Sequence, residues 1–271
     1  MMKRILAFIL VIVLCLPLCA CGKSEAVKAA EEAINSIGEV TLDSESAILN
    51  AEKLYNLLTD AEKAEVSNRL TLVDAREAYD KLLAEQVEQQ KKVIYEKAKE
   101  AYEKINIVAS LCIDGMDDIY AAWHFGIYTA DDCTASNVYT KLANETSFNS
   151  SELKKAASEL YGIDADLMAY GLMSDFNDCI FTVIKALEIR GDYSTVESEM
   201  SAAQAILNEL TNEYGDSTYY PELKKYFVSV SSYVEFFKVP SGSFGQLATT
   251  VDNYETTIRQ HQSDLKFVFA N

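Results

Sequence analysis

Apolar residues recur at spacings of three and four along almost the whole chain, and very little interrupts them. The clearest stripe consists of Ile94, Ala98, Ala101, Ile105, Val108 and Cys112. Spacings that alternate between four and three place side chains on one face of an α-helix. Only three prolines and ten glycines occur in 271 residues, so few positions can stop a helix. Because strand-like alternation is absent as well, the sequence predicts an all-α fold.

A basic and apolar segment opens the chain. Lys3 and Arg4 precede an apolar run of sixteen residues, Ile5 to Ala20, and small residues end that run. This layout is typical of a secretory signal peptide. The run contains Pro17 and is shorter than the ~20 residues that a membrane-spanning helix needs. We therefore interpret residues 1–20 as a signal peptide.

The sequence around the expected cleavage point, Leu18-Cys19-Ala20-Cys21, resembles a bacterial lipobox. The resemblance implies that cleavage falls just before Cys21 and that this cysteine carries lipid, typically a diacylglyceryl group with acyl chains such as palmitate. Two acyl chains hold a protein on a membrane far more firmly than one. We expect a Gram-positive, Firmicutes-type surface lipoprotein, anchored by Cys21 to the outer face of the cell membrane and otherwise extracytoplasmic.

Three amphipathic patterns follow a short polar spacer, and together they can bury one small core. The stripes are Val27-Ala30-Ile34-Ile37, Ile48-Ala51-Tyr55-Leu58 and Leu72-Ala75-Tyr79-Leu82. Between the second and third stripes, Thr59 and Glu62 match the T-x-x-E capping box that opens a helix. We predict that residues 21–86 hold the lipidated cysteine, the spacer and a three-helix module.

Part of this module carries a second resemblance. The run AINSIGEVTLDS over residues 33–44, followed by Tyr55-x-x-Leu58, Lys63-x-x-Val66-x-Asn68 and Leu72-x-x-Ala75, is similar to the FIVAR-type three-helix module of Firmicutes surface proteins and extracellular glycosidases. The resemblance covers residues 24–86, in a single copy where tandem arrays are usual. It implies a spacer or binding accessory and supplies no catalytic residue.

Residues 87–271 are predicted to form a second, larger domain. The stripes indicate helices at about 90–128, 131–144, 151–161, 164–190, 193–214, 220–238 and 243–269. The four long ones, with 220–238 alongside, are typical of an up-and-down bundle. Strong helix formers also link the two domains, which favours one shared helix from about 69 to 128. Such a helix would measure about 90 Å at 1.5 Å per residue; a kink near 86–90 is the alternative.

Charge and cysteine content exclude several classes of function. The formal net charge is −18 and becomes −20 without Lys3 and Arg4. This charge argues against binding of nucleic acid and against binding of anionic lipid through Lys and Arg side chains. Outside the signal region only Cys112, Cys133 and Cys179 remain, so at most one disulfide can form within the chain, and whether any does stays open. The absence of C-x-x-C argues against a zinc knuckle.

Ser151-Glu152-Leu153-Lys154 matches the S-x-x-K motif of serine β-lactamases, but the partner motifs S-D-N and K-T-G are missing, so we interpret the serine as a helix cap. No G-x-S-x-G, phosphate-loop, zinc-protease, calcium-loop or di-iron motif occurs, so we predict no catalytic residue, cofactor or metal. His261 falls on an apolar stripe and is interpreted as a core or boundary histidine. Aromatic residues crowd residues 214–237, and Tyr219 and Tyr220, which precede the helix proper, are the candidates for an exposed interaction surface.

Two functions follow as hypotheses. The first is a non-enzymatic spacer and binding module at the cell surface, with a protein or a cell-wall carbohydrate as partner. The alternative is a helical-bundle enzyme or a metal or ligand sensor with a carboxylate-lined pocket. A buried cluster of three or more carboxylates around 114–118 or 175–178 would favour the alternative.

Overall fold

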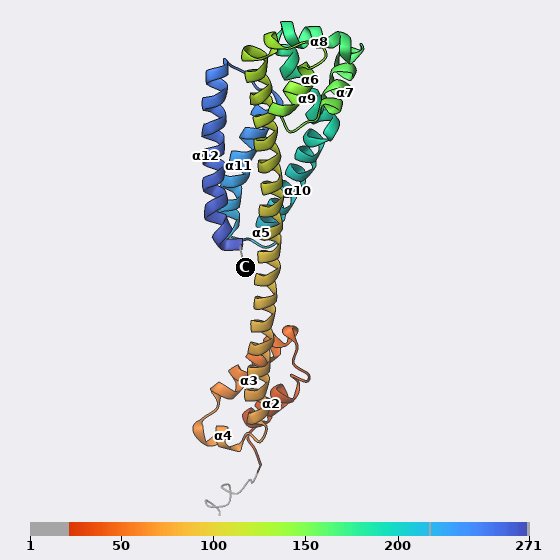
Figure 1. Cartoon of the computed structure of the whole chain (residues 1–271). Helices are drawn as coiled ribbons and strands as arrows, with labels where there is room; N and C mark the ends of the chain where they lie inside the picture. The colour runs from red at the N-terminus through yellow and green to blue at the C-terminus, as the bar shows by residue number, and fades with distance from the viewer. Residues whose placement is uncertain (1–21, 217, 270–271) are drawn as a thin grey trace, which may run out of the picture. The chain divides into compact units, whose positions relative to one another are not determined.

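The computed structural model describes residues 22–216 and 218–269, so the predicted signal peptide and Cys21 lie outside the described residues. Within these two ranges the chain forms eleven α-helices and two short 3-10 helices, and no strand (Figure 1). The predicted all-α fold is confirmed. None of the described helices is both long and apolar enough to cross a membrane.

The chain divides into two compact units, residues 1–91 and 92–271, where the sequence placed a boundary between 86 and 87. Helix α5, Arg69–Tyr128, is continuous over 60 residues and contributes its first part to one unit and its remainder to the other. The chain is therefore assigned as helical throughout residues 86–90. Residues 83–93 are all exposed, so no core packing stabilises the helix there. Its stability in this stretch comes from helix-forming residues and from ion pairs within the helix, such as Lys91 Nζ with Glu88 Oε1 (2.7 Å).

The first unit contains α2 (Glu25–Asn35), η1 (Leu42–Ser44), α3 (Glu45–Leu57), α4 (Asp60–Glu65) and the start of α5. Its core is formed by the predicted stripes, including Val27, Ile34 and Ile48, which are all buried. The capping box opens α4 as expected: Thr59 Oγ1 accepts a hydrogen bond from Glu62 N (3.3 Å), and Glu62 Oε2 accepts one from Thr59 N (3.0 Å).

Polar contacts join α2 and α3 to the region where α5 begins. Glu31 on α2 accepts hydrogen bonds from Ser67 N (2.7 Å) and Ser67 Oγ (2.6 Å) and pairs with Lys23. The Lys23 ammonium and the Ser67 donors lower the pKa of Glu31 to about 2. Arg76 on α5 binds Glu52 on α3 in a bidentate pair, with both distances 2.7 Å. These contacts fix the three helices around the small core.

The second unit adds seven α-helices and one 3-10 helix to the later part of α5. They are η2 (Ala130–Asp132), α6 (Val138–Glu145), α7 (Ser150–Tyr161), α8 (Ala165–Ser174), α9 (Phe176–Arg190), α10 (Asp192–Asn212), α11 (Tyr220–Lys238) and α12 (Phe244–Phe269), of which η2 is a 3-10 helix. Within this unit, α10, α11 and α12 run alongside α5 (Figure 1). The α5 stripe from Ala98 to Cys112 is fully buried against them. A Cβ on Gly115 would lie 2.6 Å from Phe237 Cε2, so α5 and α11 approach closely there.

Two predicted helices differ from the structure. The helix expected at 131–144 begins only at Val138, after η2 and a turn. The helix expected at 164–190 is broken at Asp175, which has an extended backbone (φ −136°, ψ 113°). The Asp175 carboxylate accepts a hydrogen bond from Asn177 N (2.9 Å) and thereby caps α9. The side-chain cap therefore interrupts the helix, although the apolar stripe continues through Asp175.

Candidate functional site

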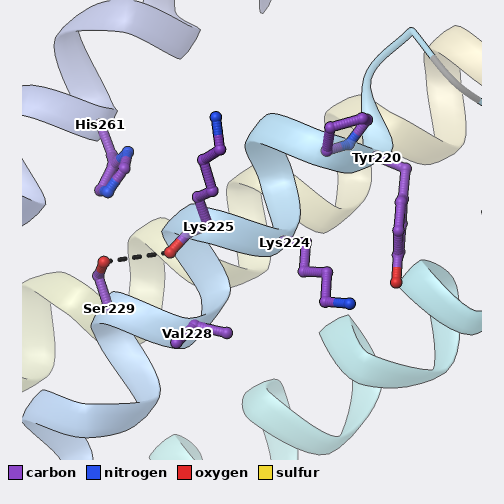
Figure 2. Close-up of a pocket in the computed structure, with 7 residues that line it drawn as sticks. Tyr220, Lys224, Lys225, Val228, Ser229 and His261 are labelled. Carbon is purple, nitrogen blue, oxygen red and sulfur yellow. Dashed lines mark hydrogen bonds between the residues drawn. The ribbon is translucent and has the colours of Figure 1, made fainter.

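The second unit carries an open groove between α11 and α12, with a volume of about 650 Å³. We call it the α11 groove; its lining residues are Tyr220, Pro221, Lys224, Lys225, Val228, Ser229 and His261 (Figure 2). All but His261 lie on the first half of α11. The spacings from Pro221 through Lys224 or Lys225 to Val228 are three and four residues, which places these side chains on one helical face.

The start of α11 is fixed by a carboxylate. Asp216 accepts hydrogen bonds from the backbone N–H groups of Thr218 (2.8 Å), Tyr219 (3.0 Å) and Tyr220 (2.9 Å). Pro221 follows in the first turn, where its missing N–H costs nothing and its fixed φ suits the helix. The groove therefore begins at a helix terminus whose N–H groups are already capped by Asp216.

A buried polar network lies beneath the groove and ties three helices together. Tyr226, which is fully buried, donates from its hydroxyl to Asn106 Oδ1 on α5 (2.7 Å). Gln262 on α12 donates from Nε2 to the same oxygen (3.2 Å), and the Tyr102 hydroxyl donates to the Gln262 carbonyl (3.2 Å). Burial raises the pKa of Tyr226 well above its usual value, so its hydroxyl stays a donor. His261 lies beside this network, with its ring centroid 5.9 Å from that of Tyr226.

The groove combines two cations with an apolar surface. Lys225 Nζ lies 2.6 Å from Glu222 Oε1, and Lys224 Nζ lies 5.6 Å from the centroid of the Tyr220 ring. Among residues 22–216 and 218–269, no carboxylate lies within 4 Å of Lys224 Nζ. Val228, one helical turn after the two lysines, is 53% exposed. Such a surface can bind a ligand through ion pairs and apolar contact.

The one serine that lines the groove, Ser229, is engaged by the backbone. Ser229 Oγ donates to the carbonyl oxygen of Lys225 (3.1 Å), one helical turn earlier (Figure 2). Its proton is therefore directed at α11 and away from His261. In this geometry Ser229 is not hydrogen-bonded to His261, the general base that could activate it.

The structure separates the two tyrosines that the sequence singled out. Both are half-buried, so they are less exposed than expected, and their role as an interaction surface stays a prediction. Tyr219 packs among Tyr95 on α5 (centroids 6.0 Å apart) and Phe269 on α12 (5.7 Å). Tyr220 lines the groove beside Lys224. The cause is that the start of α11 packs onto α5 and α12, which no local pattern around residue 219 reveals.

Sequence reasoning missed the lysines of the groove. The sequence signal that could have found Lys224 and Lys225 is that they lie off the apolar stripe of this helix together with an apolar residue, Val228. The structure shows that Val228 is exposed. His261 is half-buried at the groove, in agreement with its interpretation as a boundary histidine.

A second cavity, of about 420 Å³, lies among Asp114, Asp117, Asp118, Ser147, Arg190 and Leu111. Asp114 and Asp117 are exposed. Asp118 is buried, and it accepts hydrogen bonds from Ser147 N (2.6 Å) and Ser147 Oγ (2.5 Å). Arg190 Nη2 lies 3.8 Å from Asp118 and 2.6 Å from Asp192, the other buried aspartate of the described chain. This arrangement cross-links α5, α9 and α10.

Within the ranges that the structure describes, the carboxylates at 114–118 and 175–178 do not form a buried cluster of three. In the same ranges no group of three or more His, Cys, Asp or Glu side chains is placed to hold a metal ion. Cys112 and Cys179 are buried and Cys133 is half-buried, and all three are free thiols. Burial raises the pKa of both buried thiols to about 12.

The fold is that of a helical bundle, and its second unit has an open groove that bears two lysines. Comparison with family models, curated proteins and solved structures finds no match.

Proposed function

We propose that this protein is a lipid-anchored, extracytoplasmic binding module of the cell surface that works without catalysis. The observation that carries the proposal is the α11 groove, which offers Lys224, Lys225 and an exposed apolar surface on a rigidly held pair of helices. A preformed surface of this kind loses little free energy to ordering when a partner binds. The partner is a protein or a cell-wall component.

The lipid anchor rests on the residues before Ser24. Leu18-Cys19-Ala20-Cys21 follows an apolar run with a basic start, and the resemblance to a lipobox places lipid on Cys21. Without Lys3 and Arg4 the net charge is −20, which provides no overall electrostatic attraction to anionic lipid, so in this proposal the acyl chains attach the protein to the membrane.

The first unit serves as the spacer in this proposal. It has its own core and its own polar contacts, such as those of Glu31 with Ser67, and the helix α5 continues from it into the second unit. Its similarity to FIVAR-type modules of Firmicutes surface proteins implies the same accessory role. The second unit then carries the binding surface.

Cell fractionation tests the anchor. The full-length protein, expressed in a Firmicutes host with labelled palmitate, is expected to incorporate label, to sediment with membranes and to be digested by protease added to intact cells. The Cys21→Ala variant is expected to lose the label and to leave the membrane fraction. A cytoplasmic, protease-protected protein, or equal labelling of both forms, would contradict the proposal.

A further inference from the structure

Four features of the α11 groove specify the chemistry of what it binds. The first is charge: a chain with 42 acidic and 24 basic residues places two adjacent lysines, Lys224 and Lys225, at its groove. Lys225 lies on the same side of α11 as His261, whereas Lys224 lies on the side of Tyr220 (Figure 2). The two ammonium groups can therefore meet two separate anionic groups of one ligand.

The second feature is that these cations are free to change partners. Lys224 Nζ has no carboxylate within 4 Å in the described residues and lies 5.6 Å from the centroid of the Tyr220 ring. The pair of Lys225 with Glu222 has side chains 61% and 55% exposed, and such solvent-exposed pairs contribute little stability. A ligand carboxylate can replace Glu222 at small cost.

The third feature is the apolar surface beside the cations. Val228 is 53% exposed, and Pro221 and the ring of Tyr220 extend the same surface along α11. Covering this surface requires an apolar side chain on the ligand, placed between its anionic groups. Burial of apolar area would supply the affinity, and the charges would supply the specificity.

The fourth feature argues against phosphate. Phosphate groups favour free N–H groups at a helix N-terminus and the bidentate fork of arginine. At the start of α11 the N–H groups of Tyr219 and Tyr220 already donate to Asp216, and the groove contains no arginine. Two lysines beside an apolar surface fit carboxylates on a peptide better than a phosphate polymer.

We infer that the α11 groove binds an acidic segment of a partner protein, in which an aliphatic or aromatic side chain lies between carboxylates. The inference rests on the proposed binding function and names the chemistry of its partner. The apolar side chain contacts Val228, and the flanking carboxylates pair with Lys224 and Lys225.

The test uses the full lipid-anchored chain in nanodiscs of neutral phosphatidylcholine. The probe is a fluorescein-labelled peptide of fifteen residues in which Leu and Phe alternate with Asp and Glu, and binding is measured by anisotropy. One comparison peptide has Asn and Gln in place of the acids, and another has Ser in place of Leu and Phe. The acidic apolar peptide is expected to bind more tightly than both and to weaken as NaCl rises from 50 to 500 mM.

Charge reversal locates the site. Lys224→Glu with Lys225→Glu is expected to weaken binding by about tenfold or more, because two attractive pairs become repulsive. The matched control reverses Lys91 and Lys92, which are also adjacent and exposed on a helix, with Lys91 paired to Glu88 as Lys225 is to Glu222. This control is expected to change the affinity less than about twofold. Circular dichroism checks that both variants fold.

The inference would be overturned if the neutral peptide bound as tightly as the acidic one, or if both charge reversals weakened binding equally. It would also be overturned if polyphosphate or phosphatidylglycerol vesicles bound through Lys224 and Lys225 more tightly than the acidic peptide. A photocrosslinking amino acid placed at position 228 on intact cells separates this inference from the proposed binding function. A crosslinked partner whose contact segment is not acidic would overturn the inference and leave the binding function intact. The absence of any crosslinked partner would contradict the binding function itself.

Discussion

Arg190 is the residue whose removal should most clearly destabilise the second unit. Its guanidinium donates to Asp192 through Nε (3.0 and 3.1 Å) and Nη2 (2.6 Å), and to Ser147 Oγ through Nη1 (2.8 Å). Asp118 lies 3.8 Å away. Both aspartate side chains are nearly inaccessible, at 5% and 7% exposure. Arg190→Met keeps much of the side-chain volume and leaves two buried carboxylates without their cation.

The magnitude follows from this geometry. Removing one member of a buried ion pair costs about 3–5 kcal/mol, because the remaining charge is desolvated and uncompensated. The Arg190 side chain is 36% exposed, so water can partly replace it, and Asp118 keeps both hydrogen bonds from Ser147. We therefore expect a loss of about 3 kcal/mol, which is about 6–12 °C in Tm for a unit of this size.

Urea denaturation followed by tryptophan fluorescence measures the effect. Trp123 is the only tryptophan of the chain, lies on α5 in the second unit and stacks near Phe176 (centroids 6.4 Å apart), so its signal reports that unit. The control adds Asp118→Asn and Asp192→Asn to Arg190→Met. Because the buried charges are then gone, the triple variant should recover about half of the lost stability.

A loss below about 0.5 kcal/mol for Arg190→Met would show that water solvates the two aspartates in the folded state. A triple variant that is less stable than the single one would show that the carboxylates contribute through contacts other than the arginine. Either result would refute the argument that Arg190 neutralises a buried pair.

Three further predictions follow from named groups. The pKa of Glu31 is about 2 in the folded first unit, against an ordinary value of 4.5, so its ionised form stabilises that unit above pH 4.5 and this stabilisation is lost as the pH falls toward 2. In an acid titration followed by circular dichroism, the stability of Glu31→Gln should therefore depend less on pH than that of the unchanged protein. Cys133 should react with a thiol reagent in the folded protein, whereas Cys112 and Cys179 should react only in denaturant; fast reaction of all three would contradict their burial. Gly115→Ala should destabilise the second unit by about 1–2 kcal/mol in urea, since overpacking outweighs the gain in helix propensity; a stabilised variant would show that the neighbouring ring moves away.

The sequence predicts the fold well where apolar spacing is regular. The stripe from Ala98 to Cys112 is buried as expected, and the polar stretch of helix formers before it stays helical. The prediction fails at Asp175, where a side-chain cap breaks the helix without any change in the apolar pattern. A carboxylate can either face solvent within a helix or cap the next one, and the local sequence does not distinguish these roles.

The candidate site depends on contacts that spacing does not encode. Pro221, Lys224 and Val228 share a helical face that can be read from the sequence, but His261 joins them only because α12 packs beside α11. The same packing covers Tyr219, which the sequence alone leaves exposed. Local patterns predict helices and faces, whereas the groove follows from how the helices assemble.

Site-specific photocrosslinking on intact cells tests the central claim, that the α11 groove binds a partner outside the membrane. A benzophenone amino acid replaces Val228 on α11, and the control replaces Leu160 on α7, which is an exposed aliphatic residue of the same unit. We predict a discrete crosslinked product from position 228 that sediments with membranes, is sensitive to external protease and disappears when Lys224 and Lys225 are both changed to Glu. Crosslinking that is absent at position 228, equal at position 160, or unaffected by the lysine changes would contradict the account.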